Sequence, residues 1–193
     1  MKRILDVLAS GGGLLFFSPI LWLFMGLIWL QDRHAPFYIA TRVGIGEKPF
    51  RMVKLRSMIV GADKTGVDST AAEDARITWV GRIIRRYKLD ELSQLWNVLK
   101  GEMSLVGPRP NVPREVALYT AEEKRLLHVK PGITDFSSIV FSDEGAVLAG
   151  SADPDLKYHQ IIRPWKSRLG LLYVEKRSFS LDLRLIWLTL VAI

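Results

Sequence analysis

The chain contains no cysteine in 193 residues. It therefore cannot form a disulfide framework, a zinc site built on thiolates or a cysteine nucleophile. Its three histidines, His34, His128 and His159, show no metal-ligand spacing with one another. The histidines are expected to be ordinary surface or helix residues, and the absence of cysteine suits a reducing compartment.

Acidic residues are in the minority, with 20 Asp and Glu against 27 Lys and Arg, a net charge of +7. A surface of this sign usually meets phosphates, in nucleic acid, lipid headgroups or nucleotides, and charge alone does not choose among them. The length suits one domain with appendages. Because 49% of the residues are hydrophobic while 24% are charged, the apolar residues must be segregated.

Charge is absent from residues 11–30, GGGLLFFSPILWLFMGLIWL. This is about the length that crosses a bilayer as one helix. Pro19 lies in the middle and predicts a kink at Ser18, because it removes a backbone hydrogen bond. Cations flank both ends, so the positive-inside rule gives no orientation. A spanning helix and a re-entrant helix that bends at Ser18-Pro19 both fit, and kinked spanning helices are the commoner case.

Residues 37–58, FYIATRVGIGEKPFRMVKLRSM, predict a β-hairpin that turns at Gly44 and Gly46. Strand alternation places Lys54 and Arg56 on one face. A solvated strand face explains these two cations as well as a binding role does. Residues 61–75 show no apolar period and are expected to form a mobile loop.

Residues 76–87, RITWVGRIIRRY, predict a helix whose cationic end leads into an acid pair, Asp90 and Glu91. Its apolar positions at helical spacing are Val80, Ile83, Ile84 and Tyr87.

A second amphipathic helix is expected from Leu89 to about Gly101. Its apolar stripe would consist of Leu89, Leu92, Trp96 and Leu99, and a polar stripe of Asp90, Gln94 and Asn97. Asp90 has two interpretations. It could cap the helix by accepting from the Ser93 backbone N–H, or act as a nucleophile that the positive end of the helix keeps ionised.

The prolines of residues 104–113, SLVGPRPNVP, predict a stiff loop that holds Arg109 in a position suited to phosphate oxygens. Thr120 and Glu123 have capping-box spacing and predict a further helix start. The tail from Ser180 is expected to be a helix capped by that serine, packed in the core or lying on a bilayer. A second acid pair, at residues 143–144, has no arginine nearby in the sequence and ranks below the first.

Three segments in order, KLRSM, LDELSQLWNVLKGEMSLVGPRP and KPGIT, follow the apolar Ser-Pro segment. With these motifs the chain resembles the bacterial sugar transferase family, the small monotopic phosphoglycosyl transferases, over nearly its whole length. The resemblance implies an α+β, mainly helical fold. Residues 1–35 would form a re-entrant membrane helix-break-helix, broken at Ser18-Pro19, so re-entry replaces spanning. Residues 36–193 would form a small cytosolic catalytic domain with a short β-hairpin and amphipathic interfacial helices.

The same resemblance implies an enzyme that transfers a sugar-1-phosphate from a UDP-sugar to polyprenol phosphate and releases UMP. Asp90 would attack the β-phosphate and form a covalent phosphosugar, with Glu91 as the second member of the dyad and Mg²⁺ bound at Asp90. Phosphate and nucleotide contacts are implied for Lys54, Arg56, Arg76, Arg85, Gln94 and Arg109.

The implied location is the bacterial inner membrane, monotopic, with the catalytic domain on the cytoplasmic face in contact with phospholipids. No nucleic acid partner is expected, and a homodimer is left open. Because the membrane segment opens the sequence, the minimal form of the family is expected. After PGIT the chain departs from the family pattern at Asp135 and Ser138, which leaves the identity of the sugar open. The competing hypothesis is a non-catalytic basic protein that docks on anionic membranes or serves as a scaffold, but it does not explain acids beside cations.

Overall fold

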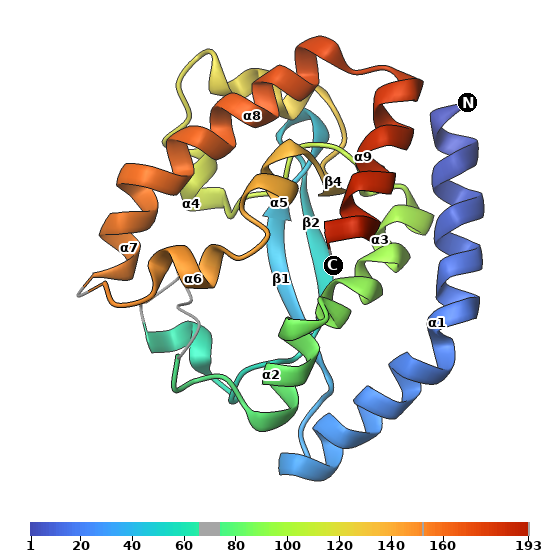
Figure 1. Ribbon diagram of the computed structural model, residues 1–193, viewed down its shortest axis with the longest axis vertical. Coiled ribbons are helices and arrows are strands. Elements are labelled where there is room, and N and C mark those ends of the chain that lie inside the picture. Colours follow the sequence, from blue (N-terminus) through green and yellow to red (C-terminus); the bar gives the residue numbers. More distant parts are fainter. Residues whose placement is uncertain (66–73, 152, 193) are drawn as a thin grey trace.

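The computed structural model describes residues 1–65, 74–151 and 153–192. It is mainly helical, with two small sheets, which confirms the expected α+β class (Figure 1). The α-helices and strands are α1 (Lys2–Asp32), β1 (Phe37–Val43), β2 (Pro49–Leu55), α2 (Trp79–Arg86), α3 (Leu95–Lys100), β3 (Ser104–Val106), α4 (Pro113–Val116), β4 (Gly132–Thr134), α5 (Phe136–Val140), α6 (Glu144–Leu148), α7 (Pro154–Lys157), α8 (Arg163–Lys176) and α9 (Phe179–Ala192). Short 3₁₀ segments are η1 (Ile45–Glu47), η2 (Ala62–Thr65), η3 (Leu89–Gln94) and η4 (Glu123–His128), and a π-helical turn, η5, covers Tyr158–Ile162.

The predicted hairpin is confirmed, since β1 and β2 pair antiparallel from Phe37 opposite Leu55 to Val43 opposite Pro49. The turn is η1, where Gly46 has a φ of 64°, a value that favours glycine.

The two cations predicted to share a hairpin face do different things. Lys54 points toward the acid pair. Arg56 follows the end of β2, is only 8% exposed, and forms a two-oxygen ion pair with Asp32 at 2.5 and 2.7 Å. The Arg56 N–H donates to the Pro36 carbonyl at 2.8 Å, so the extended pairing continues past β2, and both side chains line one pocket although their partners differ.

A parallel pairing of β3 with β4 was not expected from the sequence. It brings two glycines into close approach. A Cβ on Gly132 would lie 2.1 Å from the Gly107 nitrogen, so no other residue fits without a backbone shift. The contact holds the loop that carries Arg109 beside the segment that carries Asp135.

The helix predicted from Leu89 is in fact two segments, the 3₁₀ segment η3 and then α3. Because a 3₁₀ helix turns in three residues, the apolar stripe shifts. Leu95 and Val98 are buried, whereas Trp96 is 52% exposed, so the predicted stripe is wrong at Trp96. The end of α3 at Gly101, with a φ of 89°, is as predicted.

Asp90 does not cap a helix. The N-cap of η3 is Lys88, in the left-handed region at a φ of 51°, and no side chain caps the segment. Ser93 instead donates its hydroxyl to the Asp90 carbonyl at 3.1 Å. The capping interpretation is therefore wrong, and the Asp90 carboxylate is left to the pocket.

The other helix starts agree with the sequence in part. Thr120 and Glu123 make the predicted reciprocal bonds, although a 3₁₀ segment follows. The cap of α9 is Ser178, whose hydroxyl accepts from the Leu181 N–H at 3.2 Å, and not Ser180 as predicted.

In α2 the buried residues include Val80 and Ile84, while Ile83 and Tyr87 are exposed, against the prediction. Of the loop expected at 61–75, residues 66–73 lie outside the described residues, and η2 precedes them.

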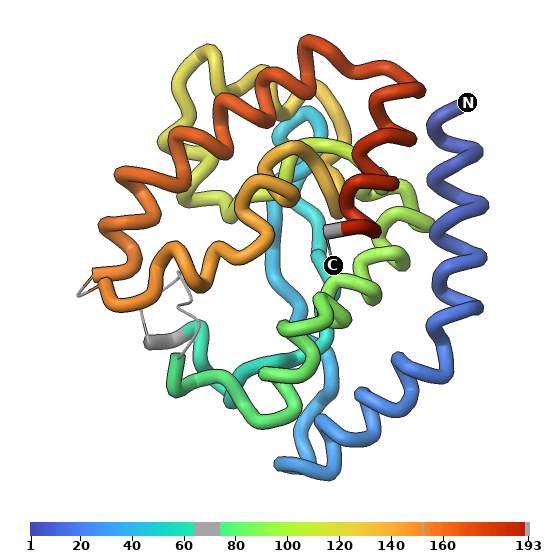
Figure 2. The backbone as a smooth tube through the Cα atoms, in the orientation of Figure 1, coloured from blue at the N-terminus to red at the C-terminus, as the bar shows by residue number. Residues whose placement is uncertain are grey.

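Helix α1 is long and apolar enough to cross a membrane, by length and composition. It continues through Pro19 and bends about half-way along its length (Figure 2). Both of its ends bind the body of the protein. Lys2 donates to Asp182 of α9 at 2.7 Å and to the Val106 carbonyl at 2.9 Å, while Asp32 binds Arg56. The helix therefore lies along the body.

The core consists of several small apolar clusters. One joins α1 to α2 and the hairpin, and its buried members are Ile28, Leu55, Val80 and Ile84. Helix α9 buries Leu185 but leaves large apolar side chains exposed along its outer side, namely Leu183, Trp187, Leu188, Leu190 and Val191. The tail thus packs on the body with one side only, close to α1 (Figure 1).

Candidate functional site

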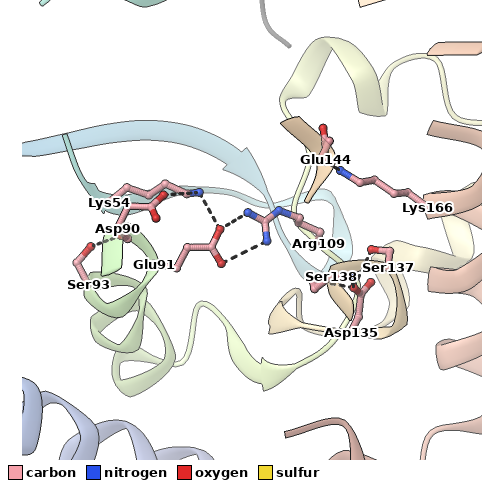
Figure 3. A network of polar contacts seen from close by, with 10 residues as sticks. All are labelled: Lys54, Asp90, Glu91, Ser93, Arg109, Asp135, Ser137, Ser138, Glu144 and Lys166. Carbon is pink, nitrogen blue, oxygen red and sulfur yellow. Dashed lines mark hydrogen bonds and ion pairs between the residues drawn. The ribbon is translucent and has the colours of Figure 1, made fainter. Parts of the chain in front are cut away.

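A broad pocket opens where the hairpin, η3, the loop at residues 107–110, α5, α6 and α8 meet, with a volume of about 1310 Å³. The acid pair lies on its wall, together with cations from four parts of the chain. Figure 3 shows the polar side chains that converge there.

At the centre, Asp90 and Glu91 share a cation. The Lys54 Nζ lies 3.0 Å from one Glu91 oxygen and 3.6 Å from an Asp90 oxygen. Arg109 donates from both terminal nitrogens to the two oxygens of Glu91. Glu91 is therefore held from two sides, whereas one Asp90 oxygen has only the longer contact with Lys54 (Figure 3).

Two small polar side chains fix η3 against β2. Ser93 donates to the Val53 carbonyl at 3.1 Å as well as to that of Asp90. Asn97, 1% exposed, accepts from the Val53 N–H at 3.0 Å and donates to the Arg51 carbonyl at 2.8 Å. Lys54 is also on β2, so these bonds fix the position of the acid pair relative to Lys54.

The environments of the two carboxyls push their pKa values apart. Burial raises the pKa of Asp90, and the negative charge of Glu91 adds to this, while Lys54 opposes it. Burial would also raise the pKa of Glu91, but Arg109 and Lys54 outweigh burial and hold that pKa well below its usual range. Glu91 is therefore a fixed anion, and Asp90 is the carboxyl with a less neutralised charge.

The remaining predicted cations take different positions. Arg85 of α2 lies in the pocket, where the charge of Asp90 acts on it, and burial lowers its pKa. Arg56 and Arg76 also line the pocket, but each forms an ion pair away from the acid pair, Arg56 with Asp32 and Arg76 with Asp74 at 2.6 Å. Of the predicted cations, the structure thus brings Lys54 and Arg109 into contact with the acid pair.

The amino-acid sequence matches a known protein family over its whole length. The sequence model of the family described as bacterial sugar transferase matches residues 1–193. The chain belongs to the bacterial sugar transferase family.

Individual relatives agree with this assignment. An uncharacterized sugar transferase of Bacillus subtilis is 34% identical over 98% of the chain and 85% of its own length. An undecaprenyl-phosphate glucose phosphotransferase of Komagataeibacter xylinus is 36% identical over 98% of the chain and 35% of its own length. A UDP-glucose:undecaprenyl-phosphate glucose-1-phosphate transferase of Caulobacter vibrioides is 39% identical over 72% of the chain and 53% of its own length. The chain thus spans only about a third to a half of the last two proteins.

Gln94 of this sugar transferase lines the same pocket and is only 2% exposed. Its Nε2 is buried and has no hydrogen-bond partner in the part of the chain that the structure describes. A buried amide donor without a partner is costly. Gln94 thus keeps an unpaired donor at the edge of the pocket.

The sequence did not predict two charged residues that line the pocket, Lys166 and Glu144. Lys166 of α8 binds Glu144 of α6 and lies over the Tyr158 ring, on the side of the pocket beyond Arg109. Glu144 belongs to the acid pair that ranked lower because no arginine lies near it in the sequence. Its partner is 22 residues away on another helix, so no local pattern reveals it.

Asp135, at the departure from the family pattern, is 1% exposed and caps α5. It accepts from the Ser138 N–H at 2.8 Å and from the Ser137 hydroxyl at 2.7 Å. Its neighbour on the wall, Asp143, caps α6. Two of the acids in this region therefore order helix starts.

Arg42 of β1 is a further residue that the sequence reasoning did not place in the site, and it lines the pocket on the same side as Arg109. Strand alternation offered the signal, because Arg42 lies four residues after Tyr38, which pairs with Lys54.

The donor atoms of the site determine whether it could hold Mg²⁺. The described residues contain no group of three or more His, Cys, Asp or Glu that could hold a metal ion. Mg²⁺ commonly uses one or two carboxylates and completes its shell with substrate phosphates and water. Asp90, which faces the pocket and is not held by a close cation on both oxygens, fits that role. A metal here would depend on the phosphates of the substrate.

Proposed function

We propose that this sugar transferase moves a sugar-1-phosphate from a UDP-sugar to polyprenol phosphate and releases UMP. Relatives named for transfer to undecaprenyl phosphate support the acceptor class, and the Caulobacter relative's name supports a UDP-sugar donor. The observation that carries the proposal is the unequal pair, a clamped Glu91 beside a less neutralised Asp90, in a pocket lined with cations.

In the proposed first step, an Asp90 oxygen forms a bond to the β-phosphorus of the donor. The bond from that phosphorus to the bridging oxygen breaks, and UMP leaves with the electron pair. The protein now carries the sugar phosphate as an acyl phosphate. No proton needs to move, because the carboxylate attacks as an anion and the leaving phosphate keeps the charge.

In the second step, a phosphate oxygen of the acceptor attacks the same phosphorus and frees the Asp90 carboxylate. Both steps bring anions together, so cations must neutralise the transferring group. Lys54 lies next to Asp90, and Arg109 lies next to Glu91. Mg²⁺ bound at Asp90 would add charge neutralisation on the phosphates. Glu91 positions the two cations and is not the nucleophile, because both of its oxygens already accept from them.

We also infer that α1 is re-entrant, so that the protein is monotopic with its catalytic domain on the cytoplasmic face of the inner membrane. Both ends of α1 bind the same body, through Lys2 at one end and Asp32 at the other. A helix that crosses a bilayer would leave its first residues on the side opposite the body. The bend at mid-helix supports a return to the same face (Figure 2).

The decisive experiment replaces the nucleophile. Asp90→Asn, purified in nanodiscs with undecaprenyl phosphate and Mg²⁺, should release UMP from a panel of UDP-sugars at least about 10³-fold more slowly than the native chain. The native protein incubated with donor alone should gain the mass of one phosphosugar, and the variant should not. Asp153→Asn, at the exposed N-cap of helix α7, makes the same change of charge away from the pocket and keeps a capping oxygen, so as the matched control it should keep activity.

Undiminished UMP release by Asp90→Asn would refute the proposed nucleophile. Membrane docking without turnover, weakened by salt and indifferent to Mg²⁺, would support the non-catalytic hypothesis instead.

A further inference from the structure

Arg42 differs from the other partly buried arginines of the pocket in what surrounds it. Within the described ranges its guanidinium makes no hydrogen bond or ion pair, and neither does the guanidinium of Arg85. The ionisable groups that act most strongly on Arg42 are Tyr38, Arg109, Tyr158 and Arg114. Arg85, by contrast, has Asp90, Asp74 and Glu144 around it. Arg42 is thus a pocket guanidinium without an ion pair among the described residues, and the charge of Arg109 acts on it.

Such an arrangement is unfavourable unless an anion binds. Burial lowers the pKa of Arg42, and the charge of Arg109 lowers it further. An arginine fork is suited to two phosphate oxygens at once. The ring of Tyr158 does not neutralise it at neutral pH, since burial raises the pKa of Tyr158 to about 12. Arg42 therefore fits an anionic group of a ligand.

The cations of the pocket form a series that leads away from the nucleophile. Lys54 contacts both acids, Arg109 contacts Glu91, and Arg42 contacts neither acid but is acted on by Arg109. A phosphorus that Asp90 attacks must lie beside Lys54. The phosphate bonded to it through the bridging oxygen lies one group farther along, toward Arg109 and Arg42.

Arg42 and Arg85 differ in their relation to the C-terminal half of α1. Strand β1 begins just after the C-terminal end of α1, and Arg42 lies roughly 16 Å along the strand from Phe37. Arg85 is instead on α2, whose Val80 and Ile84 pack against Ile28 of α1. A phosphate on a membrane lipid approaches from the α1 side, and a soluble nucleotide has no such constraint.

We propose that Arg42 binds the donor phosphate that leaves with the nucleotide, and therefore acts in the first half of the reaction only. This inference rests on the proposed function. When the bridging bond breaks, the electron pair stays on the bridging oxygen and the leaving phosphate gains one negative charge. An otherwise uncompensated guanidinium at that position stabilises the new charge. The acceptor phosphate in the second half does not use it.

The test separates the two half-reactions in nanodiscs. The donor is whichever of UDP-glucose and UDP-N-acetylgalactosamine the native protein turns over. Without acceptor, Arg42→Met should slow the single-turnover release of UMP about 100-fold, and Arg42→Lys about tenfold, because lysine keeps the charge but not the fork. Arg51→Met, an exposed arginine of the same hairpin, should stay within about twofold.

The second measurement starts from protein already loaded with phosphosugar and freed of donor. On addition of undecaprenyl phosphate, Arg42→Met and Arg42→Lys should transfer the group within about threefold of the native rate. On addition of labelled UMP instead, the reverse formation of UDP-sugar should be slowed as much as release was. A protein that merely misfolds would lose both half-reactions together.

Equal loss of both half-reactions in Arg42→Lys, or unchanged UMP release in Arg42→Met, would overturn the assignment. If the native protein never loads a phosphosugar, the proposed function and this inference both fall. If the native protein loads a phosphosugar and the Arg42 variants release UMP at the native rate, the proposed function stands and Arg42 alone is misassigned.

Discussion

Two buried amides on neighbouring turns, Gln94 and Asn97, have opposite hydrogen-bond environments. Asn97 is fully engaged, with Val53, Arg51 and Glu102 as partners. The Gln94 Nε2 has no partner among the described residues. The hydrogen bonds of Asn97 therefore serve the fold. We expect the unpaired donor of Gln94 to serve the binding of a ligand instead.

These environments predict opposite effects on stability. Gln94→Met keeps the length of the side chain and removes a buried unsatisfied donor, so it should raise the free energy of unfolding by about 1 kcal/mol. The same variant should lower kcat/KM for the UDP-sugar about tenfold, because a contact to the ligand is lost. Thermal unfolding in nanodiscs and UMP release measure the two effects.

Asn97→Leu is the counterpart in this comparison. It leaves a backbone N–H and a carbonyl of β2 unpaired and should lower the free energy of unfolding by about 3 kcal/mol. A stability loss of the same size in Gln94→Met would mean that its amide is bonded in the folded protein after all.

At the residue scale, the central part of the site could be predicted and its outer wall could not. Asp90, Glu91 and Arg109 lie within one continuous motif, and Lys54 lies in another. Arg42 and Lys166 enter through strand pairing and helix packing, whose partners are far apart in the sequence. A local pattern therefore carries no sign that they share a pocket.

At the scale of elements, α1 makes the clearest prediction. Because both of its ends bind the body, a cysteine fused before Met1 and a cysteine at the exposed Lys48 should lie on the same side of the membrane. The native chain has no thiol, so each introduced cysteine is the only reactive one.

The measurement is labelling by a membrane-impermeant thiol reagent in sealed inside-out vesicles, where both cysteines should react to a similar extent. Detergent-opened vesicles give the maximum for each site. Protection of the N-terminal cysteine alone, relieved by detergent, would establish a spanning helix.

The elements differ in how far the sequence could predict them. The hairpin has a clear period and a glycine turn, and the Gly101 stop is a single strong signal. Strands β3 and β4 have three residues each, too few for a period, and they form only because Gly107 and Gly132 allow close contact. The sequence of η3 predicts an α-helix, because 3₁₀ and α-helices differ by only a fraction of a residue per turn and six residues are too few to distinguish them.

At the scale of the whole molecule, the absence of a cage of three or more His, Cys, Asp or Glu among the described residues predicts how Mg²⁺ affects the protein. EDTA should abolish UMP release yet leave the melting temperature of the ligand-free protein unchanged, because no folding energy comes from the metal. With UMP or a UDP-sugar present, Mg²⁺ should raise the melting temperature, since phosphates complete its shell.

Differential scanning fluorimetry with and without nucleotide measures this dependence, and Ca²⁺ at equal concentration is the matched control. A large decrease of the melting temperature when EDTA is added to the ligand-free protein would contradict the prediction, because it would show that a metal stabilises the fold.

The anchoring of α1 at both ends has a consequence for biosynthesis. Asp6 accepts from Ser104 and Leu105, and Lys2 binds Asp182, so the start of α1 is bound by residues that are synthesised up to 180 positions later. At roughly 5–20 residues per second, Lys2 waits on the order of ten seconds or more for its partner. During that interval the apolar segment is on its own, without a folded body to bind. We therefore expect its insertion into lipid to precede folding, which the docking of α9 completes.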